Sequence, residues 1–311
     1  MSAPALLGGY AADLALGDPA RWHPVAGFGR LALRAERAVY APTRARGAAY
    51  ALGLTALAAL AGEALARAAR RAGAGRHAAL LVLTWAALGG RSLAHEAHGI
   101  ADLLRAGRLD AARAALPRLA GRDPAGLGEA GICRAVVESV AENTSDAVAG
   151  ALLWGALAGP AGVAAYRAAN TLDAMVGHRS ERYESFGWAA ARLDDLMSWP
   201  AARGAAALAV VLAPVAGGSP RTAWRVLRRD GAAHPSPNAG RMEAAFAGAL
   251  GVRLGGPLRY GTSAEHRPRL GDGRPPEIAD VQRAIRLSLA VGATAAVTCA
   301  VARAAIARAW R

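Results

Sequence analysis

Residues 138–146 have the sequence ESVAENTSD and stand directly before a long apolar run. Glu138, Glu142 and Asp146 recur at every fourth position, so a helix would place their carboxylates on one face. Arg134 lies one helical turn earlier on that face and would supply a counter-charge. Because ionisable residues are costly beside membrane-like sequence, this stretch predicts either a salt-bridged helix end or a functional site.

The apolar run after this stretch is interrupted by three glycines and by Pro160, which predicts a bend or break in the helix. A second polar group follows the run and contains Arg167, Asn170 and Asp173. A straight span of about twenty residues would hold the two polar groups about 30 Å apart. The sequence therefore predicts either that the segment folds back or that the two groups belong to different sites.

The composition excludes several classes of function. All 37 basic residues are arginine, and the formal net charge is +14. Without lysine the chain has no P-loop lysine and no Schiff-base lysine. No nucleic-acid partner is expected, because no zinc finger, RNA-binding signature or basic-aromatic run accompanies the charge. Cys133 and Cys299 predict neither a disulfide framework nor a metal site.

Arginine-free stretches are the membrane signal, because a central arginine costs roughly 3 kcal/mol on insertion scales. They run over residues 1–20, 47–66, 77–90, 135–166, 204–220 and 287–302. Most approach the roughly 17 to 25 residues that cross a bilayer as a helix. We predict an all-α, polytopic integral membrane protein with about four to six membrane helices, some of them broken or re-entrant. An alanine-rich soluble helical protein is the alternative.

No stretch of low hydrophobicity marks a domain boundary, so we predict one membrane domain over residues 1–311. Two soluble-looking loops, at about 91–133 and 219–285, are expected to be helical. His95 and His98 in the first loop could share a metal ion, but an exposed polar stripe is favoured because no third ligand stands at regular spacing.

Carboxylates clustered beside arginines suit a divalent cation and a phosphate. Mg²⁺ takes carboxylate oxygens and shares phosphate oxygens, and arginine binds phosphate in a bidentate manner. The alternative is structural salt bridges, Arg134 with Glu138 and Arg192 with Asp195, where the membrane meets water. For the group as a whole we favour function, because polar residues crowded at membrane borders are usually functional.

Six motifs then follow one another along the chain. They are GDPARWHPV from residue 17, GRD from 121, ESVAENTSDAV from 138, YRAANTLDAMVGH from 166, YESFGWAAARLDD from 183 and SPNAGRMEAAFAGALGVRLGG from 236. In this order they resemble the cobalamin-biosynthesis membrane protein family CobD/CbiB, the adenosylcobinamide-phosphate synthases. The resemblance implies a multi-pass protein of the cytoplasmic membrane that joins adenosylcobyric acid to (R)-1-aminopropan-2-ol O-phosphate, with ATP as co-substrate and Mg²⁺.

Carried onto this sequence, the resemblance and the polar pattern together give a set of candidate site residues. The candidate catalytic residues are Glu138, Glu142, Asp146, Asp173, Asp194 and His23, of which Glu138, Glu142, Asp146 and Asp173 are the expected Mg²⁺ ligands. The candidate substrate- and phosphate-binding residues are Arg167, Asn170, Arg192, Arg203, Asn143, Ser236 and Asn238. Asp194 or His23 is expected to accept the ammonium proton of the amine.

The expected partners are the corrinoid and aminopropanol phosphate substrates, membrane lipid and other late cobalamin-pathway membrane enzymes. No tightly bound organic cofactor is expected, because the corrinoid is a substrate. If ATP is used, the active site should face the cytoplasm. Two other functions stay open: an AmpE-like membrane signalling protein, and a corrinoid transporter, because charged residues beside broken spans also describe a substrate pathway.

Overall fold

The computed structural model describes residues 3–19, 23–121, 123–178, 180–260 and 263–309. The chain divides into two compact units. Unit 1 comprises Met1–Gly89, Asp146–Ala201 and Ala295–Arg311, and unit 2 comprises Gly90–Ser145 and Ala202–Thr294. We predicted one membrane domain over residues 1–311, and this stays a prediction.

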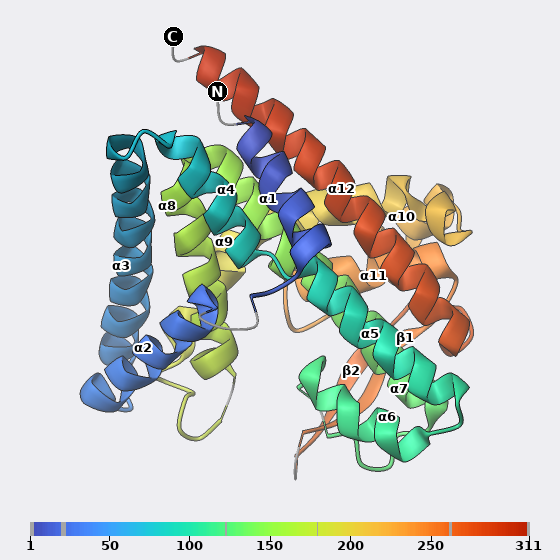
Figure 1. Cartoon of the computed structure of the whole chain (residues 1–311). Helices are drawn as coiled ribbons and strands as arrows, with labels where there is room; N and C mark the ends of the chain where they lie inside the picture. Colours follow the sequence, from blue (N-terminus) through green and yellow to red (C-terminus); the bar gives the residue numbers. More distant parts are fainter. Residues whose placement is uncertain (1–2, 20–22, 122, 179, 261–262, 310–311) are drawn as a thin grey trace. The chain divides into compact units, whose positions relative to one another are not determined.

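Unit 1 is built from helices (Figure 1). They are α1 (Ala3–Leu16), α2 (Pro24–Val39), α3 (Arg44–Arg71), α4 (Gly75–Ala87), α8 (Gly150–Leu172), the π-helical turn η3 (Asp173–Gly177), the start of α9 (Trp188–Val211) and the end of α12 (Ile278–Ala309). α3 packs along α8 and α4, and α1 packs on α4. Many of the buried residues are alanine and glycine, which let helix backbones approach closely.

α8 is broken at Gly159, where φ is 65° and ψ is −145°. This backbone conformation is essentially restricted to glycine. Pro160 opens the second half of the helix, where its missing N–H costs no hydrogen bond. The two halves lie against each other, because the Tyr166 hydroxyl donates to the Asp146 carbonyl at 3.2 Å and a Cβ on Gly150 would lie 2.0 Å from the Tyr166 ring. The segment therefore folds back, as the first predicted alternative required, and whether the two polar groups share one site stays a prediction.

Arg303, near the end of α12, closes the tip of this helical hairpin. Its Nη1 donates to the carbonyls of Ala156 at 3.1 Å and Leu157 at 3.5 Å. These carbonyls end the first half-helix and have lost their intrahelical donors. A guanidinium both satisfies them and opposes the negative end of the helix dipole, so the break is tolerated away from water.

Unit 2 combines helices with one antiparallel hairpin. It contains α5 (Gly90–Arg105), α6 (Leu109–Ala115), η1 (Leu116–Arg118), α7 (Glu129–Asn143), the rest of α9, η4 (Ala213–Ala216), α10 (Pro220–Asp230), α11 (Ala239–Leu250), β1 (Leu254–Tyr260), β2 (Ser263–Leu270) and most of α12. The π-helical turn η2 (Thr144–Ala149) follows α7, and the unit boundary falls within it. The sequence did not predict the two strands, because Gly255 and Gly256 favoured a loop. The pairing shifts register there, as at a β-bulge.

Three helical stretches in the described part of the chain are long and apolar enough to cross a membrane. They are Arg44–Arg71, Glu129–Gly177 and Ile278–Ala309, and α1 is a shorter apolar helix. α3 also exposes large apolar side chains, including Leu52 and Leu60, as lipid contact requires. The prediction of a helical membrane protein is confirmed.

Candidate functional site

The second half of α8 and the first part of α9 bring polar side chains of unit 1 into one hydrogen-bond network. Arg167 Nη1 donates to Asn170 Oδ1 at 3.1 Å, and Asn170 Nδ2 donates to Asp194 Oδ1 at 3.3 Å. Ser198 Oγ donates to the same Asp194 oxygen at 3.4 Å and lies 3.2 Å from the Tyr166 hydroxyl. These five residues are called the unit 1 network below. They bring together three predicted site residues from two helices.

Carboxylates outnumber the guanidinium in and around the unit 1 network. Asp194 is only 8% exposed, so its carboxylate is largely removed from water. Arg167 interacts electrostatically with Asp194 and with two further carboxylates, Asp18 and Asp146. Three carboxylates around one guanidinium leave a negative surplus, which suits a divalent cation or the ammonium group of an amine.

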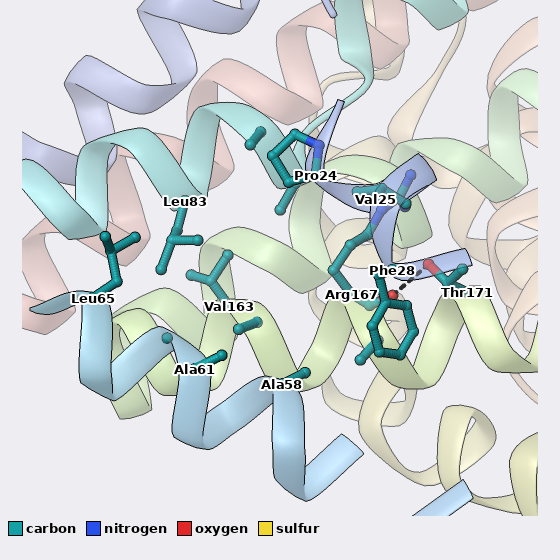
Figure 2. A pocket seen from close by; sticks show the side chains of 15 residues that line it. Pro24, Val25, Phe28, Ala58, Ala61, Leu65, Leu83, Val163, Arg167 and Thr171 are labelled. Carbon is teal, nitrogen blue, oxygen red and sulfur yellow. Dashed lines mark hydrogen bonds between the residues drawn. The ribbon is translucent and has the colours of Figure 1, made fainter. Parts of the chain in front are cut away.

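An apolar groove of about 260 Å³ opens beside this network in unit 1 (Figure 2). Helices α2, α3, α4 and α8 form its walls, with Phe28, Leu65, Leu83 and Val163 among the side chains that line it. Arg167 is the one charged side chain among the described lining residues. An apolar groove with one charged side chain can orient a ligand that has both an apolar part and a charged group.

His23 begins α2 as its N-terminal cap. Its Nδ1 accepts the Val25 N–H at 3.2 Å, and its Nε2 lies 3.7 Å from Asp18 Oδ1. In this tautomer Nε2 carries the proton, so both ring nitrogens are engaged. His23 Nδ1 would have to release the Val25 N–H before it could accept a proton. Asp194 needs no such rearrangement, so it is the better placed of the two candidate bases. Both roles stay predictions.

Arg192 forms the salt bridge that was the alternative to a functional role. Its Nη1 lies 3.9 Å from Asp195 Oδ2, and its side chain is 68% exposed. Burial raises the pKa of Asp195, and the Arg192 charge opposes that shift. In the described part of the chain, Arg192 thus pairs with Asp195 and forms no hydrogen bond to the unit 1 network.

In unit 2, Glu138 holds the beginning of β1. It is 1% exposed, and its Oε1 accepts the Gly255 N–H at 2.7 Å. Arg134 Nη1 donates to the Gly255 carbonyl at 2.6 Å, and its Nε lies 3.9 Å from Glu138. Asn143 Nδ2 donates to the carbonyl and hydroxyl of Ser139 at 3.0 and 3.2 Å. These predicted site residues therefore make fold-stabilising contacts, including the predicted Arg134–Glu138 bridge.

Ser236 and Asn238 lie at the entry to α11, as predicted for a helix start. Ser236 Oγ accepts the N–H groups of Asn238 and Ala239 at 3.3 and 3.1 Å. Asn238 Oδ1 accepts from Arg203 Nη1 at 3.2 Å. Burial and the neighbouring Arg241 lower the pKa of Arg203, so a bound anion there would stabilise both guanidiniums.

One buried polar cluster in unit 2 and two members of the unit 1 network were not among the predicted site residues. Glu243, within α11, is fully buried, with His234 Nε2 at 3.8 Å and Arg267 Nη1 at 3.9 Å from its Oε1. A carboxylate inside an alanine-rich helix was the available signal. Tyr166 precedes Arg167 directly, and Ser198 follows Asp194 by one helical turn.

Comparison with known proteins decides the family. Residues 6–288 match the family model described as CobD/Cbib protein. The cobalamin biosynthesis protein CobD of Mycobacterium tuberculosis is 55% identical over 285 residues, which cover 92% of this chain and 90% of that protein. The chain belongs to the CobD/CbiB family.

Two further relatives agree with this assignment. The CobD protein of Chromobacterium violaceum is 45% identical over 284 residues, with 88% of both chains covered. That of Geobacter metallireducens is 44% identical over 273 residues, with 84% and 83% covered. No solved structure matches. Membership in the CobD/CbiB family makes this protein a membrane enzyme of cobalamin biosynthesis.

The four carboxylates expected to bind Mg²⁺ in this CobD/CbiB protein are divided between the units. Glu138 and Glu142 belong to unit 2, and Asp146 and Asp173 to unit 1. Among the described residues, no group of three or more His, Cys, Asp or Glu side chains could hold a metal ion. Mg²⁺ often uses one or two carboxylates together with substrate phosphates. Binding of a metal that arrives with a substrate phosphate stays a prediction.

Proposed function

We propose that this CobD/CbiB protein is an adenosylcobinamide-phosphate synthase, a carbon–nitrogen ligase of the cytoplasmic membrane. It joins the free propionate carboxylate of adenosylcobyric acid to the amine of (R)-1-aminopropan-2-ol O-phosphate. The observation that carries the proposal is the similarity to cobalamin biosynthesis proteins over most of the chain. Because ATP is cytoplasmic, the active site faces that side, where other late-pathway membrane enzymes can deliver and collect corrinoids.

The reaction needs an activated acid, because a carboxylate and an amine do not condense unaided in water. In the proposed sequence the carboxylate attacks the γ-phosphorus of ATP, giving an acyl phosphate and ADP. The amine then attacks the acyl carbon, forms the C–N bond and expels inorganic phosphate, and one proton is released overall. Mg²⁺, when bound, would neutralise phosphate charge during the first step.

The residues of unit 1 support specific roles in this sequence. Asp194 accepts the ammonium proton before attack, held in place by the amide of Asn170 and the hydroxyl of Ser198. Arg167 binds a substrate phosphate, because its guanidinium lies at the apolar groove. Asp146 and Asp173 would supply oxygen ligands for the metal that accompanies the nucleotide.

Product formation by the purified protein tests the proposal. The full chain in detergent is incubated with adenosylcobyric acid, aminopropanol phosphate and Mg·ATP, and the condensed corrinoid is sought by mass spectrometry. Omission of each substrate in turn is the matched control. Absence of product, together with counterflow of unmodified corrinoid in vesicles, would instead support transport.

A further inference from the structure

A second cavity, in unit 2, gathers three arginines from separate elements and is called the three-arginine cavity below. Arg134 belongs to α7, Arg253 immediately precedes β1, and Arg269 belongs to β2. The cavity has a volume of about 260 Å³, and Gly255 and Gly256 contribute to its wall. The phosphate-binding arginines predicted from sequence include none of these three, and the proposed reaction uses none of them.

Two of the three guanidiniums are not held by other side chains. Arg253 is partly buried and Arg269 is exposed. Within the described part of the chain, neither side chain forms a hydrogen bond or an ion pair. Arg134, in contrast, donates to the Gly255 carbonyl at 2.6 Å and lies 3.9 Å from Glu138. The cavity thus has one fixed guanidinium and two that remain available to a ligand.

The described carboxylates around the three-arginine cavity are already engaged or face solvent. Glu138 is 1% exposed and accepts a backbone N–H at 2.7 Å, so it offsets the charge of its neighbour on α7 only. Asp280 accepts from Arg274 at 2.6 Å, and Glu277 lies 3.5 Å from the same guanidinium. Glu129, in the first turn of α7, is exposed, so water screens its charge. The other two arginines therefore leave a surplus of positive charge, which attracts an anion.

The backbone around the three-arginine cavity also favours an anion. Ala130 and Gly131, in the first turn of α7, line the cavity. N–H groups in the first turn of a helix have no partner within the helix, and they favour negative charge. The N-cap residue of α7 is Gly128, which has no side chain to accept from them. Side chains and backbone thus have the same polarity at this cavity.

We propose that the three-arginine cavity is a binding site for a small free phosphate, of which inorganic phosphate is the simplest. The site is formed by unit 2 alone, and it does not rest on the proposed ligation reaction. Its volume of about 260 Å³ lies below the roughly 300–1,000 Å³ of pockets for drug-sized ligands, so it suits a small anion better than a nucleotide. Guanidinium groups bind phosphate oxygens in pairs, and a dianion matches the charge of the two available arginines.

Bound phosphate would connect α7 to both strands of the hairpin, because the three arginines come from these elements or directly precede them. A ligand that binds only the folded protein stabilises it in proportion to the logarithm of its concentration, once that concentration exceeds the dissociation constant. Phosphate should therefore raise the melting temperature of the protein, whereas chloride at the same ionic strength should not.

Titration calorimetry and thermal unfolding of the full-length protein in detergent test this assignment, with inorganic phosphate as the probe. Arg253→Gln and Arg269→Gln should each lower the affinity for phosphate about tenfold or more, because each removes a charged hydrogen-bond donor. Both variants should melt like the wild type without phosphate, because neither side chain has a described partner to lose. Arg225→Gln, at an exposed position on α10, is the matched control and should bind phosphate normally.

Equal phosphate affinity in the wild type, both cavity variants and the control would overturn the assignment, because the net charge of +14 would then explain the binding. Absence of phosphate binding to the wild type would also overturn it. Further titrations use ATP and nanodiscs that contain phosphatidic acid or only phosphatidylcholine. If the two cavity variants weaken only the binding of ATP or only that of phosphatidic acid, free phosphate is excluded as the ligand. Neither measurement requires turnover, so the ligation assay tests the proposed function separately.

Discussion

The two units hold their polar side chains in different ways. In unit 1, Arg167, Asn170 and Asp194 are bonded to one another through side-chain atoms. In unit 2, Glu138 accepts from the backbone of β1, and Ser236 accepts from the backbone at the start of α11. A side chain that satisfies backbone groups is part of the fold, whereas side chains that position one another can be tuned for chemistry. Substitutions in the unit 1 network should therefore affect activity first, and substitutions of Glu138 or Ser236 should affect stability first.

The largest effect on activity is expected at Asp194, and not at the adjacent Asp195. Asp194→Asn removes the proposed base from the unit 1 network and should slow product formation by about 100-fold or more. Asp195→Asn is the matched control, because Asp195 lies 3.9 Å from the exposed Arg192 and is not a member of the unit 1 network. Both variants should melt near the wild-type temperature. Equal activity of the two variants in the mass-spectrometric assay would remove Asp194 from the mechanism.

The packing of the two halves of α8 against each other can be tested at Gly150, where they approach most closely. Gly150→Ala would place a methyl 2.0 Å from the Tyr166 ring, so the two half-helices must separate. We expect a loss of about 3 kcal/mol, near the upper range for overpacking, measured by thermal or denaturant unfolding in detergent. Gly53→Ala is the control: no atom lies within 4 Å of its added Cβ, and α3 should gain up to about 1 kcal/mol. Similar stability of both variants would contradict the helical hairpin.

The contrast between the two units would not hold if Glu138, like Asp194, were needed for activity and not for stability. Glu138→Ala leaves the buried Gly255 N–H without its acceptor and should cost about 1–3 kcal/mol of stability. Glu129→Ala on the exposed first turn of α7 should change stability by less than about 0.5 kcal/mol. Normal unfolding of Glu138→Ala together with abolished turnover would show that Glu138 is catalytic, as the sequence alone suggested.

A smaller, pH-dependent effect is expected at Asp230 in unit 2. Hydrogen bonds from Arg229, together with the Gly271 N–H at 2.8 Å, lower the pKa of this carboxyl despite its burial. A lowered folded pKa adds stability above the unfolded value of about 3.9, and this stability is lost as pH falls through the folded pKa.

Asp230→Asn should therefore lower the free energy of unfolding by about 1–2 kcal/mol at pH 7. Most of this loss comes from the buried backbone hydrogen bond, because Arg229 is half exposed and its ion pair is screened by water. The difference from wild type should shrink as pH falls below about 4, as measured by unfolding at a series of pH values. Asp110→Asn, at a position that is 94% exposed, is the control and should show little difference. A difference independent of pH would mean that the Asp230 charge is not what stabilises the fold.

Much of the helical architecture could be predicted from sequence. The arginine-free stretches 47–66 and 287–302 lie within α3 and α12, because lipid-facing helices exclude charge whatever their neighbours. The strands β1 and β2 could not be predicted, since paired glycines describe a turn as well as a bulged strand. Tyr166 and Ser198 also escaped prediction as site residues, because their roles depend on a contact between α8 and α9.

The sequence by itself determined the family, the membrane character and the polar residues available for chemistry, because these depend on residue types and their order. Only the tertiary structure decided which of those residues meet. The single backbone reversal at Gly159 brings Tyr166 back to Asp146, while Glu138 of the same acidic stripe is bonded to β1. Side chains four apart share a helix face by local geometry, but hydrogen bonds across more than one hundred residues depend on how the chain folds back on itself.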